Sequence, residues 1–148
     1  MSSGSSNLSM DAKGRIAIPV KQRDRLATEC DSQIVMTAHL QERCLLIYPA
    51  PKWVDLVARL EALPSMNRSV ARAQRLLLGC AHDLTVDANG RVLIPPVLRD
   101  FAGLQKKLVL LPIQGHFELW SEQNWLESVV ECEPDKEQLE QVMGDFSL

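Results

Sequence analysis

The sequence lacks long apolar runs, and it has few aromatic residues. Phe, Trp and Tyr together make up 5% of the 148 residues. No stretch approaches the ~18 consecutive apolar residues that a membrane-spanning helix requires. The amino-terminal segment, MSSGSSNLSMD, has no apolar core of the kind found in secretory signals. We therefore expect a cytoplasmic protein, and its 46% hydrophobic and 24% charged residues are typical of one compact domain.

Paired metal ligands and catalytic motifs are also missing. The cysteines and histidines are spread along the chain as Cys30, Cys44, Cys80, Cys132, His39, His82 and His116. No two cysteines form a Cys-x-x-Cys pair, and this spacing argues against a zinc site. Without a secretory signal, the thiols are expected to stay reduced. Because the sequence has no nucleophile–base frame and no Walker-type phosphate loop, we expect neither an enzyme nor a cofactor or metal.

Basic residues are slightly outnumbered, and the two signs are unevenly distributed. The net charge is −3, which does not favour a nucleic-acid-binding protein. Residues 1–78, however, contain 11 Lys/Arg and 7 Asp/Glu, whereas residues 79–148 contain 5 and 12. From His116 onward, Lys136 is the single base against nine acids, a pattern that predicts an acidic solvated tail. A nucleic-acid surface is therefore expected in the first half or on a local patch.

What the sequence does contain is an internal duplication. Residues 8–24, LSMDAKGRIAIPVKQRD, align without a gap with residues 84–100, LTVDANGRVLIPPVLRD. Nine of these 17 positions are identical, namely Leu8/Leu84, Asp11/Asp87, Ala12/Ala88, Gly14/Gly90, Arg15/Arg91, Ile18/Ile94, Pro19/Pro95, Arg23/Arg99 and Asp24/Asp100. Weaker similarity continues from 34–48 to 108–120. Such a repeat indicates two copies of one structural unit.

Each copy predicts two short strands joined by a tight turn, followed by a short helix and a second hairpin. Alternation of apolar and polar residues favours strands at 8–11 and 15–18. Gly14 supplies the positive φ of a tight turn, and Asn89-Gly90 is a stronger turn signal in the second copy. Pro19 ends the strand and suits the first turn of a helix.

Amphipathic periodicity predicts further helices between and after the copies. The expected helices span 51–63, 67–79 and 121–133, with a short helix or frayed tail at 135–145, and the second hairpins span 34–48 and 108–120. Gly79 is expected to cap the second helix. The chain then divides into a first module at 1–52, a helical connector at 53–79, a second module at 80–121 and a C-terminal helix with an acidic tail at 122–148.

A module of roughly fifty residues buries too little apolar surface to be stable alone. We therefore expect the two copies to bury their hairpins against each other. The predicted fold is α+β with a mostly β core, in which the hairpins of both halves interleave in one pseudo-two-fold barrel flanked by helices.

The two tight turns are the candidate functional site. The candidate DNA-binding residues are Asp11, Lys13, Gly14, Arg15, Asp87, Asn89, Gly90 and Arg91. The lysine and the arginines supply long cations, and the glycines let backbone amides approach a ligand closely. The aspartates are expected to hold each turn and to orient the arginine. Pseudo-symmetry would bring both turns to one end of the barrel, where paired cations suit phosphates and guanine edges.

A purely structural explanation competes with this hypothesis. Asp and Arg four residues apart commonly form a surface salt bridge worth ~0–1 kcal/mol. The duplicated frame is more specific, because Gly precedes Arg and an Ile-Pro pair follows it in both copies. The fold can explain the Asp, Gly, Ile and Pro, but it does not readily explain an exposed arginine in both turns.

The paired frame resembles the AbrB-type (SpoVT-AbrB) DNA-binding domain in the two-domain arrangement of the MraZ family. The segments that carry the resemblance are the two Asp-x-x-Gly-Arg turns, CLLIYPAPKW, SMNRSVARAQRLLLG and FELWSEQNW. They cover nearly the whole chain up to the acidic tail. Two departures are the start, MSSGSSN, which lacks the family's usual Met-Phe, and Asn89, which replaces the equivalent of Lys13 and makes the second turn less basic.

The resemblance implies two tandem swapped-hairpin modules and a ring-like homo-oligomer without a membrane segment. It also implies a nucleoid-associated repressor that binds direct repeats in promoter DNA. The regulated genes would be the bacterial cell-division and cell-wall cluster, including the regulator's own promoter. The DNA-contacting loop of the family falls on residues 11–15, and its second copy falls on residues 87–91.

A second hypothesis stays open, namely a ring-forming protein-interaction or antitoxin-like module that uses the acidic C-terminal helix. One face of the connector carries the basic row Arg68, Arg72 and Arg75. This row either lines a DNA surface or, as we favour, is solvated or paired with acids of a neighbouring subunit. The tryptophans are expected to pack in the interior rather than stack on bases, and they are Trp53, Trp120 and Trp125.

Overall fold

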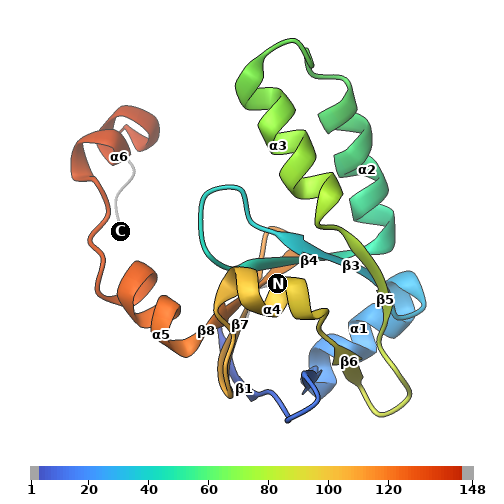
Figure 1. Ribbon diagram of the computed structural model, residues 1–148. Helices are drawn as coiled ribbons and strands as arrows, with labels where there is room; N and C mark the ends of the chain where they lie inside the picture. The colour runs from blue at the N-terminus through green and yellow to red at the C-terminus, as the bar shows by residue number, and fades with distance from the viewer. Residues whose placement is uncertain (1–3, 145–148) are drawn as a thin grey trace.

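The computed structural model describes residues 4–144 and follows the predicted duplication (Figure 1). The first copy contributes β1 (Ser6–Ser9), β2 (Arg15–Ala17), α1 (Val20–Cys30), β3 (Gln33–Ala38) and β4 (Leu45–Pro49). The connector consists of α2 (Ala50–Glu61) and α3 (Arg68–Gly79). The second copy contributes β5 (His82–Thr85), β6 (Arg91–Leu93), α4 (Pro96–Ala102), β7 (Lys107–Ile113) and β8 (His116–Ser121). The chain continues through α5 (Glu122–Trp125), the π-helical turn η1 (Leu126–Val130) and α6 (Lys136–Met143).

The main sheet is built from strands of both copies. Its six antiparallel strands have the order β1-β7-β8-β4-β3-β5. In the repeat, the strands β1, β3 and β4 correspond to β5, β7 and β8. If each strand is replaced by its counterpart, the strand order is the same when read from the opposite edge of the sheet. Each edge strand pairs with the other copy, since Leu8 lies opposite Leu108 and Leu84 lies opposite Ile34. The two halves are therefore interleaved, as the sequence predicted.

Two details of the predicted arrangement are wrong. No closed barrel forms, because β1 and β5 lie at opposite edges of the main sheet in the described chain. The strands expected at 8–11 and 15–18 also do not continue as a regular hairpin. Beyond one bridge between Met10 and Ile16, β1 joins the main sheet while β2 pairs with β6 in a separate two-stranded ribbon. An isolated hairpin is only marginally stable in water, whereas pairing with the other copy gives each short strand a partner and a shared core.

The core lies between the sheet, the ribbon and helices α1 and α4. Ile16 and Val92, which are opposite each other in the ribbon, are 1% and 3% exposed. Leu26 of α1 and Leu98 of α4 join the same cluster. A buried aliphatic side chain of this size contributes roughly 1.5–3 kcal/mol, and so the ribbon is held firmly although each of its strands has only three residues.

The connector forms a helical hairpin that stands away from the sheet on the side opposite the ribbon (Figure 1). Asn67 caps α3, because its side chain accepts the N–H groups of the second and third following residues. Gly79 is the last residue of α3 rather than its cap, which is Cys80. The buried Thr37 hydroxyl donates to the Leu77 carbonyl at 2.6 Å and ties the end of α3 to β3.

The tryptophans pack in the interior, as predicted. Trp120 is 2% exposed, and Trp125 meets it edge to face with ring centroids 6.0 Å apart. Trp53 packs against a small cluster between the sheet and the connector, beside Leu60.

The C-terminal arm, which we define as residues 122–144, contacts the rest of the described chain at its start, where Trp125 packs against Trp120 and Asn124 donates to the Ala102 carbonyl at 3.1 Å. Ser121 and Asp135 cap its two helical parts. Every residue from Leu126 to Gly144 is exposed, and the arm extends away from the sheet (Figure 1). The predicted tail beyond residue 144, and the first three residues of the atypical start, lie outside the described residues. Within residues 4–144, none of the helices is long and apolar enough to cross a bilayer.

Candidate nucleic-acid interface

The first loop, residues 11–15, is a tight turn that Asp11 holds in shape. The Gly14 N–H donates to the Asp11 carbonyl at 3.0 Å. One carboxylate oxygen of Asp11 accepts the N–H groups of Lys13 and Arg15, both at 2.9 Å, and the other accepts the Arg15 Nε–H at 2.9 Å. The bonds from Arg15 are the main reason why the pKa of Asp11 falls to about 2. The carboxylate therefore stays charged near neutral pH, and it orients Arg15 as the sequence predicted.

The second loop, residues 87–91, repeats the backbone of the first but leaves its arginine less constrained. Asp87 accepts the N–H groups of Asn89 and Arg91 at 2.9 Å each, and the Gly90 N–H donates to the Asp87 carbonyl at 2.9 Å. Within residues 4–144, however, Asp87 makes no ion pair with the Arg91 guanidinium. The prediction that the aspartate orients the arginine is therefore confirmed for Arg15 and wrong for Arg91, whose side chain is exposed.

The ribbon fixes the separation between the two loops. The Ile18 N–H donates to the Gly90 carbonyl at 2.7 Å, and the Ile94 N–H donates to the Gly14 carbonyl at 2.9 Å. Because β2 and β6 are antiparallel, the loops lie at its opposite ends, roughly 13 Å apart along the strand direction. Figure 1 shows both turns on the same side of the molecule, away from α2 and α3.

Two further arginines belong to this surface, although the sequence analysis assigned them no role. Arg23 of α1 donates from Nη1 to the Asn89 carbonyl at 3.1 Å. Arg99 of α4 covers Gly14, since a Cβ built on that glycine would lie 2.5 Å from the Arg99 Cζ. Arg23 and Arg99 are identical residues at equivalent positions of the repeat, and this identity could have indicated their role from the sequence. Lys106, whose carbonyl accepts the N–H of Met10 just before the first loop, gave no such signal.

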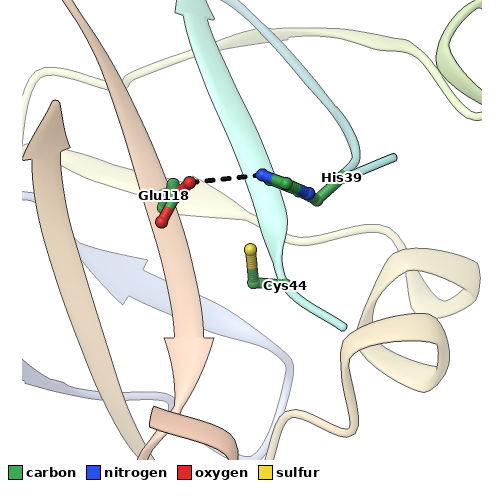
Figure 2. Close-up of side chains that lie close together, drawn as sticks. All are labelled: His39, Cys44 and Glu118. Carbon is green, nitrogen blue, oxygen red and sulfur yellow. Dashed lines mark ion pairs between the residues drawn. The ribbon is translucent and has the colours of Figure 1, made fainter. Parts of the chain in front are cut away.

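A second cluster of polar side chains lies outside the loops, beside the turn between β3 and β4 (Figure 2). The ligand atoms of His39, Cys44 and Glu118 all lie within 4.8 Å of one another, a spacing that suits a metal such as zinc. The hydrogen bonds of His39 argue against this role, because its Nδ1 accepts the N–H groups of Gln41 at 3.0 Å and Glu42 at 3.1 Å. The neutral ring therefore carries its proton on Nε2, which faces the Glu118 carboxylate at 3.3 Å as a donor. This bond lowers the pKa of Glu118, and the cluster stabilises the turn.

Comparisons with known proteins agree with the duplication. A family model described as "MraZ protein, putative antitoxin-like" matches residues 1–76 and, a second time, residues 77–143. A protein from Saccharophagus degradans is 51% identical over 148 residues and covers all of both chains. One from Marinobacter nauticus is 50% identical over 82% of each chain, and one from Shewanella baltica (strain OS185) is 42% identical over 98% of each chain. Each of these three relatives is named as a transcriptional regulator.

Proposed function

The chain belongs to the MraZ family, and from that premise we propose that it is a DNA-binding regulator of transcription. Its relatives are named as regulators, and we propose no catalytic activity. The finer proposal is a nucleoid-associated cytoplasmic repressor that binds direct repeats in promoter DNA. Its targets would be the cell-division and cell-wall gene cluster, with its own promoter among them.

The observation that carries this proposal is the pair of loops at the two ends of one short ribbon, each of which carries an arginine. The major groove of B-DNA is about 12 Å wide and admits a two-stranded β-ribbon. The separation of the loops along the ribbon, roughly 13 Å, is close to that width. In both loops the aspartate is bonded to its own backbone, and Asp11 also pairs with Arg15. Lys13 and Arg91 are exposed in spite of the net negative charge of the chain.

Some candidate residues are then proposed to contact DNA, and others are proposed to hold the loops in shape. Arg15 and Arg91 are the proposed base or phosphate contacts, and Lys13 adds a phosphate contact in the first loop. Arg15 is fixed in direction by its aspartate, and an arginine with a fixed direction suits a defined guanine edge. Arg91 is free to follow a phosphate, and Asn89 gives its loop less charge. The first loop is therefore proposed to contribute more sequence specificity than the second.

DNA binding by purified protein tests the proposal directly. The duplex carries the region upstream of the protein's own gene, a scrambled duplex serves as the reference, and affinity is measured at two salt concentrations. We expect Arg15→Ala to weaken binding about tenfold or more and to reduce the preference for the natural sequence. Arg91→Ala should weaken binding to both duplexes and reduce its salt dependence. Arg59→Ala, an exposed cation on the connector, is the matched control and should bind like the wild type.

Each variant is first checked for particle size, so that lost assembly is not mistaken for a lost contact. If the wild type shows no preference for the natural duplex at low salt, or if both loop variants bind like the wild type, the loops do not read DNA.

We propose further that the chain forms a ring-like homo-oligomer through its C-terminal arm. Val130 and Val142 of the arm are 60% and 85% exposed. Within residues 4–144, the acidic residues of the arm make no ion pair. These residues are Glu122, Glu127, Glu131, Glu133, Asp135, Glu137 and Glu140. The exposed arginines of α3 are likewise without an acidic partner in the same residues, and they are Arg68, Arg72 and Arg75. The arm of one copy against α3 of the next is a head-to-tail contact, which closes into a ring when the rotation permits.

Light scattering of the full-length protein tests this contact. Val130→Asp places a charge on the apolar face of the arm and should reduce the particle mass. Val54→Asp, at a valine of α2 that is 65% exposed, is the control and should leave the mass unchanged. A ring would present several loop pairs at once and raise affinity for spaced repeats. If Val130→Asp changes neither mass nor DNA binding, the arm is free for another protein, and the interaction-module hypothesis gains support.

A further inference from the structure

Arg23 and Arg99 occupy equivalent places in the two copies, and each touches both copies. Each is anchored within its own module, because the Arg23 Nε–H donates to the Ile18 carbonyl at 3.2 Å and the Arg99 Nε–H donates to the Ile94 carbonyl at 2.9 Å. These carbonyls belong to Ile18 and Ile94, which lie directly before Pro19 and Pro95, the N-cap residues of α1 and α4. The bonds point the two guanidinium groups across the ribbon.

Each guanidinium then lies on the glycine of the opposite module. A Cβ on Gly14 would lie 2.5 Å from the Arg99 Cζ, and a Cβ on Gly90 would lie 2.5 Å from the Arg23 Cζ. Both glycines are buried although the residues on either side of them in the loops are not. Arg23 also donates to the Asn89 carbonyl at 3.1 Å, which lies directly before the glycine.

We propose that Arg23 and Arg99 are positioning residues that act across the modules. Arg99 sets the shape of the first loop, and Arg23 sets the shape of the second. A planar guanidinium can lie close to a glycine that has no Cβ and still use the N–H donors fixed in its own plane, whereas the ammonium group of lysine is a compact point charge without that fixed fork. Each half of the chain therefore presents a loop whose geometry depends on the helix of the other half. The inference rests on the proposed function only in that the loops are taken to read DNA.

A positioning role and a direct contact with DNA predict different results when a second residue of the loops is also mutated. An arginine that only neutralises a phosphate weakens binding by about the same factor whichever loop is intact. A positioning residue loses its effect when the loop that it supports has already lost its arginine, because contacts within one network are not additive. The structure therefore predicts a crossed pattern, with Arg99 coupled to Arg15 and Arg23 coupled to Arg91.

The first experiment is a double-mutant cycle on DNA affinity with the full-length protein. Arg99→Lys and Arg23→Lys are each combined with Arg15→Ala and with Arg91→Ala. Each lysine variant alone should weaken binding about tenfold. In the crossed pairs the double variant should lose much less than the product of the single losses, and in the pairs within one module the losses should multiply. Losses that multiply in all four pairs, or coupling only within a module, would overturn the proposal.

The second experiment needs no DNA, and so it separates failure of this proposal from failure of the proposed function. Hydrogen exchange is followed by mass spectrometry in peptides that cover residues 10–18 and 86–94, where the backbone amides of the turns are bonded. Arg99→Lys should speed exchange in the first peptide, and Arg23→Lys should speed it in the second. Arg25→Lys is the control on α1, because Arg25 pairs with Glu29 of its own helix. Faster exchange in the peptide of the same module, or equal change in both, contradicts the crossed arrangement.

Discussion

Replacing Gly14 by alanine should destabilise the protein through backbone strain and through displacement of the Arg99 guanidinium. Gly14 has φ +91°, and its new Cβ would meet three side-chain atoms of Arg99 between 2.5 and 2.8 Å. A non-glycine residue in this backbone region costs about 1–3 kcal/mol. Displacing the guanidinium also breaks the bond from its Nε to the Ile94 carbonyl, and a hydrogen bond of a charged group is worth about 1.5–3 kcal/mol. Together these losses amount to about 2.5–6 kcal/mol, a large part of the ~5–15 kcal/mol that stabilises a typical domain.

Thermal and urea unfolding followed by circular dichroism measure this loss. For a chain of this size, each kcal/mol moves Tm by about 2–4 °C, and so Gly14→Ala should lower Tm by about 5–24 °C. Two other glycines serve as controls without the clash. Gly79 lies in α3 with open space around it, and Gly144 has φ +59° with open space around it. Gly79→Ala should raise the free energy of unfolding by up to ~1 kcal/mol, and Gly144→Ala should change it little because the arm carries few contacts.

The same reasoning predicts a partial rescue. In an Arg99→Ala background the clash is absent, and Gly14→Ala should then cost only the backbone strain of about 1–3 kcal/mol. If Gly14→Ala is as well tolerated as Gly79→Ala, or if its cost is the same with and without the arginine, the close approach of Arg99 to the loop is not a source of stability.

Three other predictions concern single groups. Because the pKa of Asp11 is depressed to about 2, the stability that this carboxylate contributes is present above pH ~4 and is lost as the pH falls through about 2. An NMR titration of the carboxyl group should show this midpoint, and Arg15→Met should raise it. A midpoint near 4 in the wild type would contradict the ion pair. Thr37→Val removes the buried hydroxyl that donates to the last turn of α3 and should lower the free energy of unfolding by about 1–3 kcal/mol; an unchanged urea midpoint would show that this bond is dispensable. Burial raises the pKa of Cys44, and so a thiol reagent should modify the exposed Cys132 and leave Cys44 intact until unfolding; mass spectrometry of the folded protein would refute this if Cys44 were labelled.

Local features of the fold could be predicted from the sequence because their causes are local. The turn around Gly14 follows from a glycine at positive φ and an aspartate three residues before it. The turn at Gln114-Gly115, which has no such aspartate, follows from its glycine at positive φ. The helices after Pro19 and Pro95 begin where proline stops a strand. Because the sequence is duplicated, each local prediction for one copy also applied to the other. The interleaving of the copies followed from the small size of one module.

Pairing between distant strands could not be read from the same patterns. The alternation in residues 6–9 shows which face of a strand is buried but not which strand lies beside it, and its partner is β7 rather than the neighbouring β2. The role of Arg23 was hidden for a related reason. Its identity with Arg99 is visible in the sequence, but its contact with Gly90 depends on the path of the ribbon. The loop residues were selected as candidates because chemistry and repetition coincide there, and their contact with DNA stays a prediction.

The exchange of edge strands between the copies also affects how the protein is made. Ser6 pairs with Leu110, and so the first strand leaves the ribosome about a hundred residues before its partner. At about 5–20 residues per second, the nascent first copy waits for several seconds with an unpaired edge. A chain that stops before β7 lacks the partner of β1 and four buried residues of the main core cluster, Leu108, Leu110, Phe117 and Leu119. Incomplete translation products are therefore left for chaperones and proteases, and the native fold is reached only by chains that carry both loops.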